Sequence, residues 1–121
     1  MPRFVVLEHQ WHGVHWDFML ECGDALRTWA IDLPIIVGQD LPARALSDHR
    51  LIYLDYEGEI SGNRGSVRRL DAGTYRPLVW SAGRVRVELA GSQLVGEVEL
   101  CESGSETGAT VLWIFRMGNF D

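Results

Sequence analysis

The sequence predicts an all-β protein, mainly antiparallel, that folds as a small closed or partly open β-barrel. Short runs of alternating apolar and polar residues recur along the chain, and this period of two is typical of half-buried strands. Clusters of glycine, proline and serine separate these runs, as turns separate short strands. No segment shows a sustained helical period. Together these observations favour a barrel or sandwich over a helical fold.

Two predicted strands open the chain, at residues 3–9 and 14–21, and a third follows at residues 25–31 after a turn. An apolar and aromatic segment at residues 51–56 is predicted to be a further strand. The remaining strands are alternating runs at residues 67–70, 74–80, 84–89, 93–100 and 110–116. The apolar phase of the strands is expected to point into packed core, and it includes Trp16, Phe18, Trp29 and Val87.

Three segments are predicted to be loops. Residues 33–42 contain two prolines and a glycine and are expected to cross to the next element. Residues 58–65 contain three glycines, too many for the interior of a strand. Residues 103–108, rich in glycine, serine and glutamate, are expected to form a mobile hairpin tip.

Length and composition indicate one domain, residues 1–121, because a chain of this size is typical of a single domain. No apolar run approaches the roughly 20 residues of a membrane-spanning helix. The apolar stretch near the N-terminus is too short for a signal peptide. We therefore expect a cytoplasmic protein with no membrane partner.

The charge pattern bears on nucleic-acid binding. The formal net charge is −6, which argues against a broad basic surface but leaves open a local basic groove. All eleven basic residues are arginine, whose planar guanidinium suits phosphate. A general compositional preference for arginine would explain this equally well. The two cysteines, Cys22 and Cys101, lack CxxC spacing and are expected to be buried free thiols.

Three of the four histidines lie within seven positions, at His9, His12 and His15. Residues two apart on a strand face the same side, so His15 and Asp17 can offer a nitrogen and an oxygen to one divalent ion. His9 can supply a third ligand from the end of the preceding strand. Two imidazoles and a carboxylate leave coordination positions open for water or substrate, and they suit zinc, manganese or iron. The alternative for an isolated His-x-Asp pair is a surface hydrogen bond.

A fourth histidine, His49, follows Asp48 and precedes Tyr53 at the predicted aromatic strand. It is a candidate general acid or phosphate contact, and the alternative is a loop histidine without a catalytic role. No GxSxG elbow and no phosphate-binding Walker loop occurs in the sequence, so serine-hydrolase and P-loop chemistry are not indicated.

The segment Phe4-Val-Val-Leu-Glu-His9, five residues, then His15-Trp-Asp17-Phe-Met-Leu-Glu21 resembles the opening motif of the 3′-phosphoesterase domain of bacterial DNA ligase D. The resemblance continues through Ala25-Leu-Arg-Thr-Trp29-Ala and through Asp48-His49-Arg-Leu-Ile-Tyr53-Leu-Asp-Tyr-Glu57-Gly58. Asp71-Ala-Gly-Thr-Tyr75 and the strand of Trp113 extend it over nearly the whole chain.

This resemblance implies a small β-barrel that uses a divalent metal, manganese foremost and zinc as the alternative, to process 3′ ends of DNA. It implies removal of a terminal 3′-ribonucleotide and then of a 3′-phosphate, in DNA repair. By the resemblance, His9, His15 and Asp17 are the metal ligands, and His49 with Tyr53 forms the catalytic phosphate pocket. The implied partners are DNA 3′ ends or a primer-template, together with separately encoded ligase or polymerase repair proteins.

The sequence departs from the family pattern at the expected phosphate contacts. Met19 stands where the family has an arginine, and the segment from Ile31 to Pro34 lacks the family's lysine. The glycine-rich loop is shortened, and it places Arg64 where a phosphate-binding charge can be restored. These departures support a second hypothesis, a non-catalytic, metal-containing module that binds DNA ends or another protein.

Overall fold

The structure is a computed structural model that describes residues 1–107 and 110–118. Nearly all regular structure in these residues is β-strand, apart from one short 3-10 helix. The elements are β1 (Arg3–Gln10), β2 (Val14–Cys22), β3 (Ala25–Ile31), β4 (Leu41–Arg50), the 3-10 helix η1 (Leu51–Leu54), β5 (Gly58–Glu59), β6 (Ser66–Trp80), β7 (Arg84–Gly91), β8 (Val95–Thr107) and β9 (Thr110–Met117).

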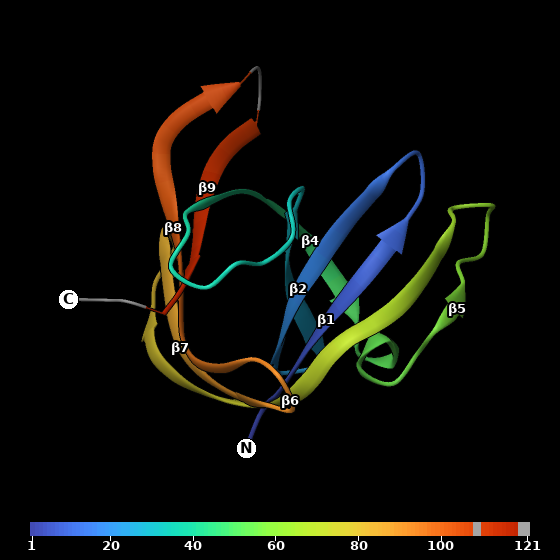
Figure 1. Cartoon of the computed structure of the whole chain (residues 1–121), viewed down its shortest axis with the longest axis horizontal. Helices are drawn as coiled ribbons and strands as arrows, with labels where there is room; N and C mark the ends of the chain where they lie inside the picture. The colour runs from blue at the N-terminus through green and yellow to red at the C-terminus, as the bar shows by residue number, and fades with distance from the viewer. Residues whose placement is uncertain (108–109, 119–121) are drawn as a thin grey trace.

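The strands close into an eight-stranded antiparallel barrel, as the sequence predicts (Figure 1). Hydrogen bonding runs in the order β1, β2, β3, β4, β9, β8, β7 and β6, and a pairing of β6 with β1 completes the ring. The two-residue strand β5 adds to the outer edge of β6. Most neighbours in the ring are also neighbours in sequence, and among the described residues only the β4–β9 and β1–β6 pairings join strands that are far apart in the sequence.

Alternation along the strands divides the apolar side chains between two clusters. The main core fills the barrel and contains, among others, Phe18, Trp29 and Val87, all fully buried as predicted. Trp16 is only partly buried and packs against the edge of that core. A smaller cluster lies on the opposite face of β1, β2 and β3, where η1 covers it; it comprises Val5, Leu7, Met19, Leu26, Leu54 and Val67.

Two predictions around the fourth strand are wrong. The predicted loop at residues 33–42 ends before Leu41, because Leu41 and Ala43 insert into the main core and start β4. The predicted aromatic strand at residues 51–56 begins instead with η1. Leu51 and Leu54, three residues apart, face the smaller cluster together, which is the spacing of a 3-10 helix. A short apolar run does not distinguish these two periods.

The predicted strands at residues 67–70 and 74–80 are one long strand, β6. Its first part pairs with β1 and its last part with β7, and both neighbours meet it at Gly73. A Cβ atom at Gly73 would lie 2.2 Å from the carbonyl oxygen of Ala90, so only glycine lets the strands approach this closely. The long strand therefore bridges the two halves of the barrel.

Two further expectations concern chain segments outside the core. The prediction of a hairpin tip at residues 103–108 is wrong for residues 103–107, which belong to the end of β8, and residue 108 lies outside the described residues. The cysteines are free, but the prediction that they are buried is wrong: Cys22, at the end of β2, is exposed, and Cys101 on β8 is half-buried. Within the described residues, no helix is long and apolar enough to cross a membrane.

Candidate metal centre

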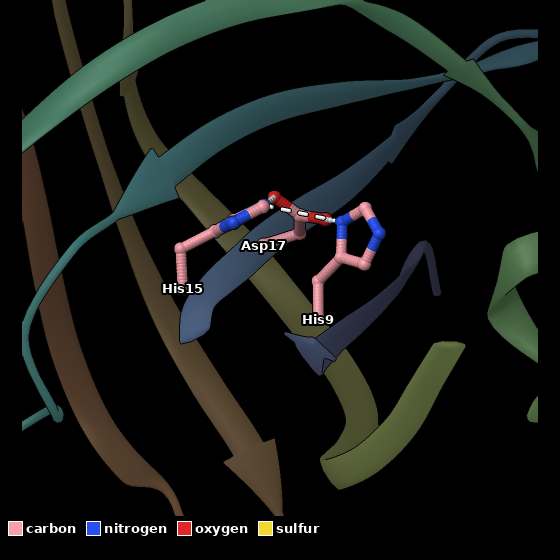
Figure 2. Close-up of side chains that lie close together, drawn as sticks. All are labelled: His9, His15 and Asp17. Carbon is pink, nitrogen blue, oxygen red and sulfur yellow. Dashed lines mark hydrogen bonds and ion pairs between the residues drawn. The ribbon is translucent and has the colours of Figure 1, made fainter. Parts of the chain in front are cut away.

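The strand register brings the three predicted metal ligands together. His9 at the end of β1 is the cross-strand partner of His15 on β2, and Asp17 follows two residues later on the same face. That face is opposite to the one that carries Phe18 into the main core. The three side chains converge on one point (Figure 2).

The converging atoms are close enough to share one ion. His9 Nδ1 lies 3.2 Å from His15 Nε2 and 3.5 Å from Asp17 Oδ2, and His15 Nε2 lies 3.0 Å from Asp17 Oδ1. All the candidate ligand atoms lie within 4.8 Å of one another. Asp17 is only 3% exposed, whereas both histidines are half-buried and face an opening.

A hydrogen bond outside the cluster fixes the tautomer of His9. Its Nε2 lies 2.8 Å from the backbone carbonyl oxygen of Arg64, and a carbonyl can only accept, so Nε2 carries the proton. In the neutral ring, Nδ1 is then the unprotonated nitrogen and directs its lone pair at His15 and Asp17. Metal-binding histidines in proteins are oriented in the same way, by a hydrogen bond from the second ring nitrogen to a carbonyl or a carboxylate.

The loop that carries this carbonyl is held close to β1 by a glycine. Gly65 has a φ of +80°, and a Cβ atom there would lie 1.9 Å from the carbonyl oxygen of Gln10 and 2.8 Å from the Cβ of Trp11. The backbone N–H of Ile60 donates to the carbonyl of Gly65 and closes the loop. The glycine-rich sequence thus places a main-chain acceptor against a metal-ligand candidate.

The electrostatics of the cluster fit a cation. Interaction with the Asp17 carboxylate raises the pKa of His15 above its ordinary value, against the opposing effect of burial. Asp17 Oδ1 is buried and lies 3.0 Å from His15 Nε2 in an ion-pair contact, and no group of the described residues donates a geometrically good hydrogen bond to it. A buried carboxylate oxygen without a partner is costly, and a bound metal ion would satisfy it.

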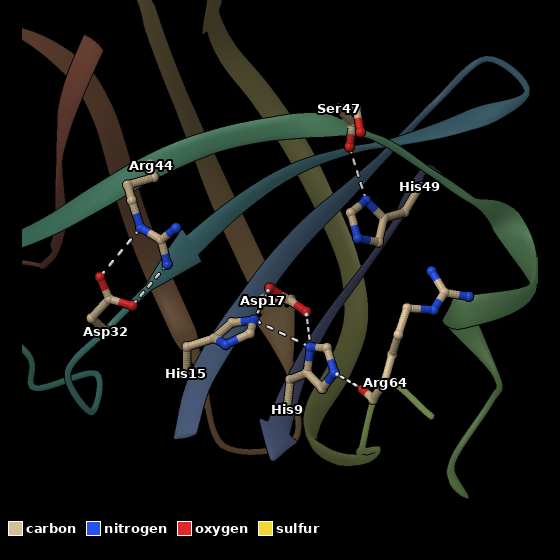
Figure 3. A network of polar contacts seen from close by, with 8 residues as sticks. All are labelled: His9, His15, Asp17, Asp32, Arg44, Ser47, His49 and Arg64. Carbon is tan, nitrogen blue, oxygen red and sulfur yellow. Dashed lines mark hydrogen bonds and ion pairs between the residues drawn. The ribbon is translucent and has the colours of Figure 1, made fainter. Parts of the chain in front are cut away.

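The cluster forms one side of an open cavity of about 570 Å³. His49 and Tyr53 line the same cavity, although they come from the end of β4 and from η1 rather than from the predicted strand. His49 Nδ1 donates to the carbonyl oxygen of Ser47 at 2.9 Å. The other ring nitrogen lies on the side that faces His9 and Asp17 (Figure 3). Tyr53 contacts the His49 ring edge-to-face, with centroids 6.0 Å apart.

The sequence suggests that Arg64 offers its charge to a phosphate, but in the structure its guanidinium is bound within its own loop. Its side chain lines the cavity, but its guanidinium donates to the carbonyl and the hydroxyl of Ser61 in its own loop, at 2.7 and 3.3 Å. Its backbone carbonyl, rather than its charge, makes the contact with the histidine cluster. Met19 lies in the cavity floor and is fully buried, so the family's arginine position supplies no charge here.

The cavity residues that sequence reasoning missed include Trp11, Arg44 and Arg50. Trp11 stacks on His9 with ring centroids 6.1 Å apart, and Arg50 lies 6.0 Å from the Tyr53 ring. Arg44 lies beside the cluster, and its charge acts to lower the pKa of His15. The available signal was the alternation of Leu41 and Ala43 with Arg44, which marks β4 as a strand with one polar face.

Fold and site together define a small antiparallel barrel with a His-His-Asp cluster in an arginine-lined cavity on its outer face. The chain belongs to the DNA ligase D 3′-phosphoesterase domain family, whose model matches residues 7–102. It is 33% identical over 112 residues to the multifunctional non-homologous end joining DNA repair protein LigD of Mycobacterium tuberculosis, and 32% identical to the corresponding LigD of Mycobacterium bovis. Each match covers 85% of this chain and 15% of the relative, so the chain spans a small part of their length.

Proposed function

We propose that this chain is a metal-dependent phosphoesterase that acts on 3′ ends of DNA during non-homologous end joining. Its substrates are ends or primer-templates that carry a 3′-phosphate or a 3′-ribonucleotide. Membership of the ligase D 3′-phosphoesterase family supports the reaction class, and the names of the relatives support the repair context. Repair ligases and polymerases are the partners that this role implies, and the cytoplasm is its location.

The observation that carries the proposal is the convergence of His9 Nδ1, His15 Nε2 and the Asp17 carboxylate at the side of an open cavity. Two imidazole nitrogens and one carboxylate suit manganese, with zinc as the alternative, and they leave coordination positions free. An ion held there would polarise a phosphoryl oxygen and lower the pKa of a bound water. Both half-buried histidines line this open cavity, which gives a DNA end access to the cluster.

The chain's own residues would bind the phosphate and move protons. His49 is oriented by its Nδ1–H bond to Ser47, which leaves Nε2 directed at the substrate. In the imidazolium form, Nε2–H would donate a proton to the leaving oxygen or a hydrogen bond to a phosphoryl oxygen, and the ring would then be neutral. Tyr53 packs against the His49 ring and restricts its rotation. Arg64 places a cation on the loop side of the cavity, where it can pair with the phosphate.

The direct test is release of inorganic phosphate from a primer-template that ends in a 3′-phosphate, with and without manganese. A second substrate ending in a single 3′-ribonucleotide tests the other activity. We expect turnover that depends on metal and is lost in His9→Ala. Absence of turnover in wild type with every divalent metal would overturn the proposal.

One observation favours the alternative, a non-catalytic, metal-containing module that binds DNA ends or another protein. Met19 is buried at the position of the family's arginine, and losing a charge-assisted phosphate contact costs on the order of 2–4 kcal/mol of transition-state stabilisation. Tight binding of 3′-phosphate DNA without turnover would support this second reading.

A further inference from the structure

We propose that Arg44 is a phosphate-binding residue of this cavity. In the free protein the Asp32 carboxylate binds the Arg44 guanidinium, and a phosphate displaces this carboxylate when it binds. The inference rests on the proposed function, because it assigns the phosphate contact of the same cavity. It places the contact on β4, away from the strand position where Met19 stands.

The sheet register places Arg44 beside the metal cluster. Asp17 on β2 is the cross-strand partner of Ala30 on β3, and Ala30 is the partner of Arg44 on β4. The three residues form one row across the sheet, and all three line the cavity. Adjacent strands are about 4.8 Å apart, so two strand spacings separate Asp17 from Arg44. The small side chain of Ala30 lies between them in this row.

The guanidinium already presents the geometry that binds an oxyanion. Arg44 donates from one terminal nitrogen to Asp32 Oδ1 at 2.9 Å and from Nε to Asp32 Oδ2 at 3.3 Å. This two-pronged contact with a carboxylate uses the same N–H edge that grips two oxygens of a phosphate. The Arg44 guanidinium is therefore already oriented for a phosphate to replace the Asp32 carboxylate.

Asp32 competes only weakly with a phosphate for the N–H groups of Arg44. The side chains of Arg44 and Asp32 are 42% and 52% exposed, so water screens their attraction. A phosphate seated near the cluster carries more charge than one carboxylate and would gain several contacts together. The carboxylate of Asp32, in turn, repels an approaching phosphate, so its removal should favour binding.

The other cations of the cavity are held differently. The Arg64 guanidinium is bound to Ser61 of its own loop, and Arg50 lies over the Tyr53 ring. Arg44 and Arg64 lie on opposite sides of the histidine cluster (Figure 3). A phosphate between them would meet a cation on either side, which replaces the single arginine expected at position 19.

The test uses inorganic phosphate, which is a product that cannot be turned over, titrated into manganese-loaded protein by calorimetry. We expect Arg44→Gln to weaken phosphate binding about tenfold, in line with one lost charge-assisted contact. Arg44→Lys should restore part of the affinity, because it returns the charge without the planar fork. Asp32→Asn should strengthen binding severalfold. Thermal unfolding of each variant verifies that the barrel is intact.

A second ion pair supplies matched controls. Arg116 and Asp40 form an exposed pair at 2.9 Å, and neither residue lines the cavity. Arg116→Gln and Asp40→Asn make the same charge changes, so they should leave phosphate affinity at the wild-type value. If Arg44→Gln behaves like Arg116→Gln, or if wild type binds no phosphate, the assignment of Arg44 is wrong.

Turnover of a 3′-phosphate primer-template separates this inference from the proposed function. If phosphate affinity depends on Arg44 and Asp32 as stated, the inference stands even where wild type releases no phosphate from DNA, and only the proposed function fails. If wild type turns over while Arg44→Gln has unchanged KM and kcat, the function stands and the inference falls.

Discussion

His9 donates from Nε2 to the backbone carbonyl oxygen of Arg64, 2.8 Å away. The acceptor is a main-chain atom, so its position depends on the dihedral angles of the glycine-rich loop rather than on the arginine side chain. The loop therefore acts on the metal cluster in two ways: it fixes the tautomer of His9 and it sets the orientation of the ring. A change that moves the loop should therefore alter the affinity for a metal ion without replacing any of the three candidate ligands.

Substitution of Gly65 tests this coupling. In Gly65→Ala the new Cβ would meet the Gln10 carbonyl at 1.9 Å, so the loop must move away from β1. We expect the affinity for manganese to fall about 10- to 100-fold, as for other losses of a hydrogen bond to a metal-binding histidine. Gly62→Ala is the control, because it shares a positive φ but meets only an ordinary contact with Arg64. Equal metal affinity of the two variants in calorimetry would contradict the coupling.

Metal binding should stabilise the protein through the ligand cluster. At a free metal concentration of 100 times Kd, the free energy of unfolding of wild type should rise by about 2.7 kcal/mol. His15→Ala should lose most of this gain, because it removes one of the three converging atoms. Thermal unfolding with and without manganese or zinc measures the difference. An undiminished shift in His15→Ala would show that the ion binds elsewhere.

His49 should affect turnover rather than metal binding. It lines the cavity but does not belong to the cluster of converging ligand atoms. We expect His49→Gln to lower kcat by about 100- to 10,000-fold, the usual range for a general acid or base, with manganese affinity unchanged. Tyr53→Phe should have a smaller effect, since the ring contact with His49 is kept. A parallel loss of metal affinity in His49→Gln would place this residue among the ligands instead.

The sequence predicts the barrel and the metal cluster because both depend on strand alternation. His15 and Asp17 share a face by their spacing alone, and Phe18 takes the other face into the core. Arg44 was harder to predict, because the alternation of Leu41 and Ala43 around it is short and is interrupted by a proline, and only the pairing with β3 and β9 places the residue beside the cluster. The role of the Arg64 carbonyl was also not predictable from the sequence, because every residue type has a backbone carbonyl that can accept a hydrogen bond.

Restoring an arginine at position 19 tests the lost family contact. The family pattern predicts that Met19→Arg raises the rate of 3′-phosphate release about tenfold, which corresponds to roughly 1.4 kcal/mol. The structure adds a cost, because Met19 is 1% exposed and packs in the smaller cluster with Leu7 and Val67. We expect the free energy of unfolding to fall by about 2–4 kcal/mol. A folded variant with an unchanged rate would contradict the first expectation.

Asp71, which does not line the cavity, links the long strand β6 to the turn between β7 and β8. Its carboxylate accepts hydrogen bonds from the backbone N–H groups of Ser92, Gln93 and Leu94, at 3.1, 3.0 and 2.7 Å. Burial by itself would raise the pKa of Asp71. The backbone N–H groups outweigh burial and hold the pKa below its ordinary value of 3.8.

The stability of the barrel should therefore depend on pH through Asp71. A lowered pKa in the folded state means that folding favours the ionised carboxylate, so this stabilisation is complete above pH 3.8 and is lost as the pH falls through the folded value. At pH 7, Asp71→Asn should lower the free energy of unfolding by about 1.5–3 kcal/mol, the usual range for hydrogen bonds to a charged group. Below pH 3.8 the difference between wild type and variant should shrink. Denaturant unfolding from pH 7 to pH 2 measures both effects.

Asp24→Asn is the control, because it removes the same charge from an exposed position in the β2–β3 turn. A constant difference between wild type and Asp71→Asn at every pH would mean that the ionised carboxylate is not what holds the turn.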